Sequence, residues 1–507
     1  MKTIFVNNFS EGIADSNYSQ RPGQFSITKH FDINAYPNRL VPHRALETDQ
    51  TDQTAIGHLI VASDGLVYGL GTDPGNPTFQ EIYKKADSTT AWDDVANTLT
   101  GKVVNYNTFV EYKNYFYTLD ANRYVMRFDR TGAAAINTTY SDLTSFTYNA
   151  QGVVHPKDDI LYIPYNNKIW SLNTHAGTPT VAALTVPSNL TITAITPYGN
   201  YLAIAAVPTA ALTTSPAGGG FKSTVYLWDR NSSLATLTES IDWGTGVIRI
   251  LNVLDGVLLG VAYNNGATTE YQDRDSIVIK GYNLATPYVI KELSTTKQTT
   301  TSPVAGINTR VNFIYRDKLY ISIKLFGGST SPTHYGVWTI GKSKQSGSFV
   351  VNLERMATND ATETDVLAAA AVGDVFYTVH TAVGTITRSV NESAFASVYA
   401  ATSIYESLIN PSMSPDDYYR AKNLAAVACY YTPLITSAQV VVKYRVDGGS
   451  WITVFTDSTD GSTGFEIGKA ASGMTTDGRY FEFRVESTGG AEIIALAYKY
   501  EIKPNLL

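Results

Sequence analysis

The chain has 507 residues, of which 44% are hydrophobic and only 16% are charged, with a formal net charge of −7. Typical domains contain roughly 25% charged residues. Tyrosine and glycine reach 34 and 38 copies, a composition typical of β-structure with many tight turns. Lysine and arginine are scattered singly, so the sequence disfavours nucleic-acid binding.

The single cysteine, Cys429, excludes an internal disulfide and lies in an apolar run, where a buried structural thiol is expected. The N-terminal residues lack the apolar segment of a secretory signal. The long apolar runs of the chain, such as Val366 to Val372, are too short to span a bilayer. We therefore expect synthesis in a cytosol, without membrane insertion.

Residues 1–50 contain no copy of the repeat that follows and are rich in Asn, Pro, Arg and Asp. We expect an extended N-terminal arm that lacks obvious burial within one domain. Within it, Gln24 to Ile33 alternates polar and apolar residues well enough to form one strand. This strand could pair with the far end of the repeat array and close a ring.

Residues 51–398 contain seven loose copies of a unit in which a tight turn is followed by an apolar strand. The clearest copy, Phe109 to Arg130, is predicted to form three short strands. A single copy could not bury its apolar faces alone, which favours a circular array. Equivalent positions lie 41 to 61 residues apart, namely Tyr68, Tyr117, Tyr162, Ala203, Leu259, Tyr320 and Tyr377.

This spacing is the size of a four-stranded blade, so the sequence predicts an all-β fold with a β-propeller of about seven blades. Six or eight blades, or a two-sheet β-fold, are the alternatives. Three inserts, at 208–222, 264–275 and 326–334, each fall between the second and third strands of a unit. Their shared position predicts contact loops on one face of the array.

Residues 399–507 are predicted to form a separate C-terminal β-sandwich, jelly-roll or Ig-like, because strand-like runs alternate with Gly, Asp, Ser and Thr turns. Val446 to Ser450 is a strong hairpin signal. Ser414 to Asp417 could begin one short helix, since proline is favoured at the first helical position.

No catalytic, cofactor-binding or metal-binding residue is predicted from the sequence. The histidines form neither an HExxH motif nor a paired metal-ligand spacing, and the motifs GxSxG and GxxxxGK[ST] are absent. Asp457 with Asp460, and Asp273 with Asp275, could bind calcium, but solvated turn carboxylates are the favoured interpretation. The seven histidines are His30, His43, His58, His155, His175, His334 and His380.

Three tryptophans occupy equivalent places in the later strand of their units, namely Trp170, Trp228 and Trp338. We therefore predict that their side chains are buried in the core of the blades. Trp451 begins a sandwich strand. It could contact a ligand or a neighbouring subunit, although packing against the sheet is favoured.

Both ends of the chain contain distinctive motifs. In the arm these are Gly12 to Ala14, Lys29 to Asp32 and Pro37 to Leu40, and near the C-terminus Val442 to Phe455 and Arg484 to Ile493. These segments resemble a family of structural proteins from tailed bacteriophages, in which the C-terminal segment is a β-sandwich. The middle of the chain matches that family only as a propeller-like array.

The resemblance implies a non-enzymatic virion component, in the tail, with the baseplate or the portal-proximal region as the alternatives. It would act as an assembly and interaction scaffold and need no cofactor. Its expected partners are other virion proteins and copies of itself, with assembly in the host cytoplasm, and we predict that the arm docks on them. One alternative is a host-surface carbohydrate-binding protein. A propeller glycoside hydrolase is disfavoured, because it requires two carboxylates facing each other across a pocket.

Overall fold

The structure of the protein is a computed structural model that separates into two compact units. Met1–Glu47, Gly336–Glu363 and Ser389–Leu507 form one unit, and Thr48–Tyr335 and Thr364–Arg388 form the other. The structure describes residues 1–14, 22–36, 38–50, 55–72, 79–85, 92–95, 99–100, 104–121, 123–132, 137–213, 221–232, 237–264, 276–294, 305–326, 332–356, 366–380, 386–389, 402–462, 466–468 and 476–503.

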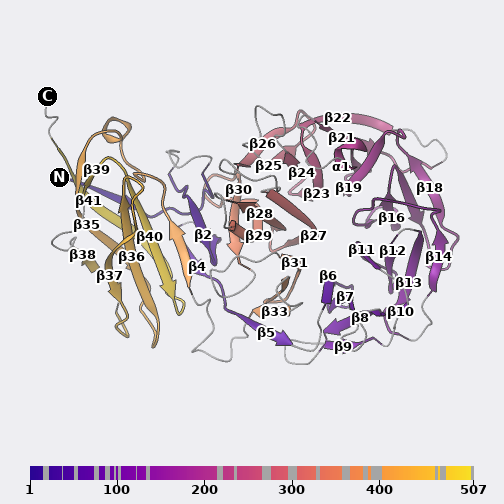
Figure 1. Ribbon diagram of the computed structural model, residues 1–507, viewed down its shortest axis with the longest axis horizontal. Helices are drawn as coiled ribbons and strands as arrows, with labels where there is room; N and C mark the ends of the chain where they lie inside the picture. Colours follow the sequence, from indigo (N-terminus) through magenta and orange to yellow (C-terminus); the bar gives the residue numbers. More distant parts are fainter. Residues whose placement is uncertain are drawn as a thin grey trace. The chain divides into compact units, whose positions relative to one another are not determined.

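Seven antiparallel sheets follow one another along the described part of the repeat region, and Figure 1 shows them arranged as a ring. The first sheet contains β6 (Ala55–Val61), β7 (Val67–Thr72) and β8 (Phe79–Lys85), with β9 (Trp92–Asp94) and β10 (Leu99–Thr100) both paired to β8. The second contains β11 (Val104–Tyr112), β12 (Tyr115–Asp120), β13 (Tyr124–Asp129) and β14 (Asn137–Asp142). The third contains β15 (Val153–His155), β16 (Ile160–Tyr165), β17 (Lys168–Leu172) and β18 (Thr180–Thr185).

The remaining sheets have the same four-stranded plan. The fourth contains β19 (Leu190–Tyr198), β20 (Tyr201–Pro208), β21 (Lys222–Trp228) and β22 (Leu237–Thr245). The fifth contains β23 (Val247–Leu254), β24 (Val257–Asn264), β25 (Ser276–Tyr282) and β26 (Tyr288–Ser294). The sixth contains β27 (Ala305–Tyr315), β28 (Lys318–Phe326), β29 (Pro332–Lys342) and β30 (Phe349–Arg355). The seventh contains β31 (Val366–Val372), β32 (Val375–His380), β33 (Ile386–Ser389) and β5 (Leu46–Gln50). The fold is therefore an all-β propeller of seven blades, as the repeat predicts.

The repeat unit buries both of its faces, which explains why it recurs. On β12, Tyr117 and Leu119 join a cluster that includes Trp170 of the next blade. Phe116, which directly precedes Tyr117 in sequence, joins a different cluster with Tyr68 of the preceding blade. Because successive strand residues point to opposite faces, each blade packs against both neighbours. One isolated copy would leave both faces in water.

The three inserts lie where the sequence places them, between the second and third strands of the fourth, fifth and sixth blades. The first begins with a short helix, α1 (Ala210–Thr213). Most of the residues in the inserts lie outside the described parts of the chain. The turn between β27 and β28 is formed by Arg316 and Asp317, which both have left-handed φ angles, of 48° and 58°.

The C-terminal segment forms two sheets together with strands from the arm. The larger sheet has the order β3 (Phe31–Tyr36), β4 (Arg39–Pro42), β41 (Ile493–Ile502), β35 (Lys422–Tyr431) and β38 (Glu466–Gly468), with β1 (Lys2–Val6) on β41 and β39 (Asp477–Gly478) on β35. The smaller sheet has the order β2 (Ile27–Lys29), β34 (Ser403–Glu406), β40 (Phe481–Thr488), β36 (Gln439–Val446) and β37 (Ile452–Asp457). The predicted short helix is a 3-10 turn, η1 (Pro415–Asp417). Among the described residues, no helix has the length and apolarity needed to cross a membrane.

The arm is extended, but the expectation that it lacks burial within one domain is wrong. Phe9, Phe25 and Phe31 are fully buried and belong to the same hydrophobic cluster as Cys429 and Phe483 of the sandwich. Apolar burial of this kind stabilises by roughly 25 cal/mol per Å². The arm is therefore part of the core of the sandwich.

The predicted ring-closing strand is also wrong. Gln24 to Ile33 divides at His30, whose φ of 59° interrupts the extended backbone, into β2 and β3. β2 pairs with β34, and β3 with β4. A later segment, β5, completes the seventh blade beside β33.

A buried charge cluster surrounds Asp49 of β5. Lys85 Nζ and Arg388 Nε lie 2.8 and 2.9 Å from Asp49 Oδ1, and Trp92 Nε1 donates to Oδ2 at 2.7 Å. The side chains of Asp49 and Lys85 are each only 2% exposed. Lys85 and Trp92 belong to the first blade and Arg388 to the seventh, so one carboxylate joins the two ends of the ring.

We expect Asp49→Asn to destabilise the propeller by about 3 to 5 kcal/mol, because removing one partner leaves the other buried charges uncompensated. Urea unfolding followed by tryptophan fluorescence measures this loss. Asp374→Asn is the matched control, since its ion pair with Arg316 is more than half exposed and should contribute below about 1 kcal/mol. Equal losses in the two variants would contradict the role given to Asp49.

Candidate functional site

The first strand of six blades is irregular at a similar place. Register shifts interrupt its pairing with the second strand in β6, β11, β19, β23, β27 and β31. Figure 1 shows these first strands on the inner side of the ring. A bulge redirects a side chain away from the ladder, so these shifts place selected residues around the axis.

Two of the bulges are longer than the others. Pairing in β11 resumes at Phe109 after Asn105, and pairing in β27 resumes at Asn312 after Asn308. Each begins with the same Asx turn: Asn105 Oδ1 accepts from the backbone N–H of Asn107, and Asn308 Oδ1 accepts from that of Arg310, both at 3.1 Å. An asparagine side chain thus stabilises the backbone at the start of each long bulge.

The two long bulges meet a third one from β6. Arg310 Cζ lies 5.3 Å from the centre of the Tyr106 ring, and Arg310 Nη1 donates to Gly57 O at 3.2 Å. A Cβ atom at Gly57 would lie 2.5 Å from Tyr106 Cδ1, so only glycine allows this ring position. The Tyr106 hydroxyl donates to Gln80 Oε1 at 2.6 Å.

His58 is buried beside this group. Its Nδ1 lies 2.6 Å from the carbonyl oxygen of Tyr106, which can only accept, so Nδ1 carries the proton and Nε2 is left as an acceptor. Burial lowers the pKa of His58 to about 4; the Tyr106 carbonyl opposes the shift, while the charge of Arg310 adds to it. The imidazole is therefore neutral at physiological pH.

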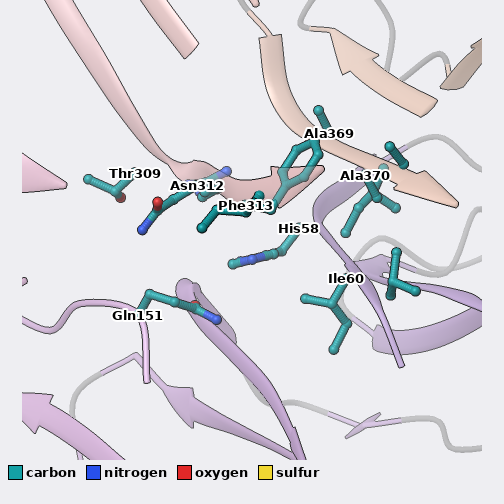
Figure 2. Close-up of a pocket in the computed structure, with 13 residues that line it drawn as sticks. His58, Ile60, Gln151, Thr309, Asn312, Phe313, Ala369 and Ala370 are labelled. Carbon is teal, nitrogen blue, oxygen red and sulfur yellow. The ribbon is translucent and has the colours of Figure 1, made fainter. Parts of the chain in front are cut away.

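Of these residues, His58 and Arg310 line an axial cavity of about 430 Å³ within the propeller unit. Its wall includes His58, Gln151, Arg310, Asn312 and Phe313, and Figure 2 shows labelled side chains from several blades gathered around it. A second cavity of about 280 Å³ shares Thr309 and Arg310 with the first and includes Lys324. None of the described residues that line either cavity is Asp or Glu.

Two amide side chains in the wall are held in fixed orientations. Gln151 forms a pair of hydrogen bonds with the backbone of Phe109, donating from Nε2 at 2.7 Å and accepting at Oε1 at 3.2 Å. Asn312 Oδ1 accepts from Asn252 Nδ2 at 3.0 Å. The polar lining is thus largely preorganised.

Sequence reasoning treated His58 as one of several scattered histidines and did not select Arg310 at all. Repeat alignment follows the regular strand positions, whereas this site consists of residues that leave the ladder. The residues that could have indicated the site are Asn105 and Asn308, which each begin a long bulge. However, an Asx turn is common in loops and specifies no function.

A separate cluster in the other unit has a metal-like composition. Ligand atoms of Asp32, His43 and Glu354 all lie within 4.8 Å of one another. However, Arg355 Nη2 lies 2.9 Å from His43 Nδ1, and because a guanidinium only donates, the imidazole proton is on Nε2, 3.2 Å from Glu354 Oε1. Burial lowers the pKa of His43, assisted by Arg355. The neutral His43 therefore lies between the opposite charges of Arg355 and Glu354.

The calcium candidates also have other roles where they are described. Burial raises the pKa of Asp457, but hydrogen bonds from Tyr431, Ser462 and Thr459 outweigh it and bring the pKa to about 2. Asp460 accepts from Thr436 Oγ1 at 3.0 Å. Asp273 and Asp275 lie outside the described residues.

The tryptophan predictions can be compared directly with the structure. Trp170, Trp228 and Trp338 are at most 1% exposed, which confirms blade core. Trp451 is half-buried, with the guanidinium carbons of Arg445 and Arg484 at 4.6 and 5.7 Å from its ring centre. It packs with charged side chains on the sandwich.

No protein-family model and no curated protein matches the sequence. Three solved structures illustrate the likeness of fold. The exo-β-1,3-galactanase of Phanerochaete chrysosporium is 11% identical, with a TM-score of 0.33 over 90% of this chain and 100% of that one. YCF48 bound to D1 peptide is 9% identical, with a TM-score of 0.41 over 69% and 96%. The designed protein Ika8 is 12% identical, with a TM-score of 0.39 over 75% and 99%. Such low scores carry no argument about ligands or activity.

The neutral, buried state of His58 predicts a pH dependence of stability. Below the ordinary pKa of 6.5 the unfolded chain takes up a proton, whereas folded His58 does so only near pH 4. The free energy of unfolding therefore falls as the pH drops from 6.5 to about 4, by about 1.4 kcal/mol per pH unit.

The comparison with His58→Gln isolates this contribution, because other titrating groups are common to both proteins. We expect the stability advantage of the wild type, measured by urea unfolding, to shrink steadily below pH 6.5. An advantage that stays constant down to pH 4 would show that His58 does not resist protonation.

Proposed function

We propose that the protein is a non-enzymatic structural component of a tailed-bacteriophage virion, located in the tail, that acts as an assembly and interaction scaffold. The resemblance at both ends of the chain supports this proposal. The two segments that carry the resemblance also lie close together in the fold, because the arm and the C-terminal strands share one hydrophobic core. Other virion proteins and further copies of the chain are its proposed partners, assembled in the host cytoplasm.

The observation that carries the scaffold role is an apolar hollow of about 490 Å³ on the larger sheet of the sandwich. Residues of strands β1, β35 and β41 line it, among them four alanines. At its edge Met1 and Phe5 are 71% and 58% exposed. Exposed apolar surface of this kind marks protein interaction sites.

The axial cavity supports the non-enzymatic part of the proposal. Glycoside hydrolysis requires a pair of carboxyl groups on either side of the scissile bond. The described lining instead offers a guanidinium, a neutral imidazole and two amides. This set can bind a polar molecule, but it contains no general acid with the properties that glycosidases use.

The docking role of the hollow can be tested by point substitution. Deleting the arm would remove Phe9 from the core of the sandwich and could unfold it, so Phe5→Glu is preferable. A charge placed in an apolar interface should reduce incorporation into particles by roughly tenfold or more. Quantitative mass spectrometry of purified virions from complemented infections measures this.

Tyr419→Glu is the matched control, because Tyr419 is 69% exposed on the same unit and does not line the hollow. It should be incorporated normally. Normal incorporation of Phe5→Glu would exclude the hollow as a docking surface, and absence of the wild-type chain from purified virions would exclude the virion role.

A further inference from the structure

We propose that the axial cavity of the propeller binds a small polyhydroxylated acid, namely a sugar that carries a carboxylate, with Arg310 as the group that recognises the acid. This inference goes beyond the scaffold role and does not depend on it. It rests on the charge of Arg310, on the bulges that hold this side chain in place and on the composition of the cavity wall.

Arg310 is a half-buried cation whose described contacts are all neutral. Its guanidinium contacts the carbonyl oxygen of Gly57 and the face of Tyr106, and its backbone N–H donates to Asn308. No carboxylate of the described residues pairs with it. Burial lowers the pKa of Arg310, as expected where charge is desolvated. A buried charge without an opposite partner is costly, and an anion in the cavity would compensate it.

The shape of the guanidinium suits a planar carboxylate. A guanidinium presents parallel N–H groups that match the two oxygens of a carboxylate. The Tyr106 ring and Gly57 fix the plane of Arg310 before any ligand arrives, so little side-chain entropy is lost on binding. Arg310 also lines the adjoining cavity, together with Lys324.

The rest of the wall suits hydroxyl groups and a sugar ring. His58 Nε2 is an acceptor, and the amides of Gln151 and Asn312 are already oriented by Phe109 and Asn252. The half-buried ring of Phe313 supplies an apolar face. A volume of about 430 Å³ falls within the range of small-molecule sites, roughly 300 to 1,000 Å³.

The rival occupant is an acidic peptide, whose side-chain carboxylate could also reach Arg310. Fixed hydrogen-bonding groups on several sides of a closed ring favour a compact ligand with many hydroxyls over an extended chain. An acidic sugar is therefore the ligand that can form hydrogen bonds with most of the polar groups in the cavity wall.

The test is calorimetric titration of the full-length protein with glucuronate, galacturonate and N-acetylneuraminate, beside glucose, galactose and a short aspartate-rich peptide. At least one acidic sugar should bind, and roughly tenfold or more tightly than its neutral counterpart. Arg310→Gln should weaken that binding by a similar factor, while thermal melting verifies that the variant is folded.

Arg249→Gln is the matched control. Arg249 also occupies a first-strand bulge and donates to a tyrosine, Tyr148, at 2.9 Å, but it does not line the cavity. Its substitution should leave binding unchanged. The proposal is overturned if no acidic sugar binds, if neutral sugars bind equally well, if only the peptide binds, or if folded Arg310→Gln retains full affinity.

Discussion

The structure depends on how its circular array is closed. Seven blades in sequence leave two ends, and β5 joins them by completing the seventh blade while its Asp49 accepts from Lys85 and Trp92 of the first. A buried carboxylate is stabilising only when its charge and lone pairs are matched. Hydrogen bonds from Lys85 and Trp92 and the nearby positive charge of Arg388 match this one. The axial cavity draws on the first, sixth and seventh blades, so its shape requires the closed ring.

Regular and irregular parts of the blades have different roles. The regular strands bury tyrosines and tryptophans between neighbours and make a rigid ring. The bulges in the first strands interrupt that regularity where the strands face the axis. Gly57, Tyr106 and Arg310 all come from such bulges, in three different blades. Binding residues in proteins are commonly held on irregular segments that a rigid scaffold positions.

The blades could be predicted from sequence because strand alternation and turn residues are local signals that recur. The closing strand could not, because Leu46–Gln50 is polar and Asp49 is buried only through partners distant in sequence. The ring-closing role predicted for Gln24 to Ile33 failed for the opposite reason. Its apolar residues do alternate, but they are buried within the sandwich. The axial site could not be predicted from the sequence, because a register shift moves Arg310 out of the repeat pattern.

The two units offer two kinds of surface: an apolar hollow on a sheet of the sandwich, and a polar cavity at the axis of the propeller. The first suits a protein partner, and the second suits a small ligand. We propose that this chain is part of a tailed-phage virion, and a reconstruction of that virion tests the proposal most directly. The account predicts that the chain is found in the tail with the hollow around Phe5 covered by another protein. A hollow that faces solvent in the assembled particle would contradict it.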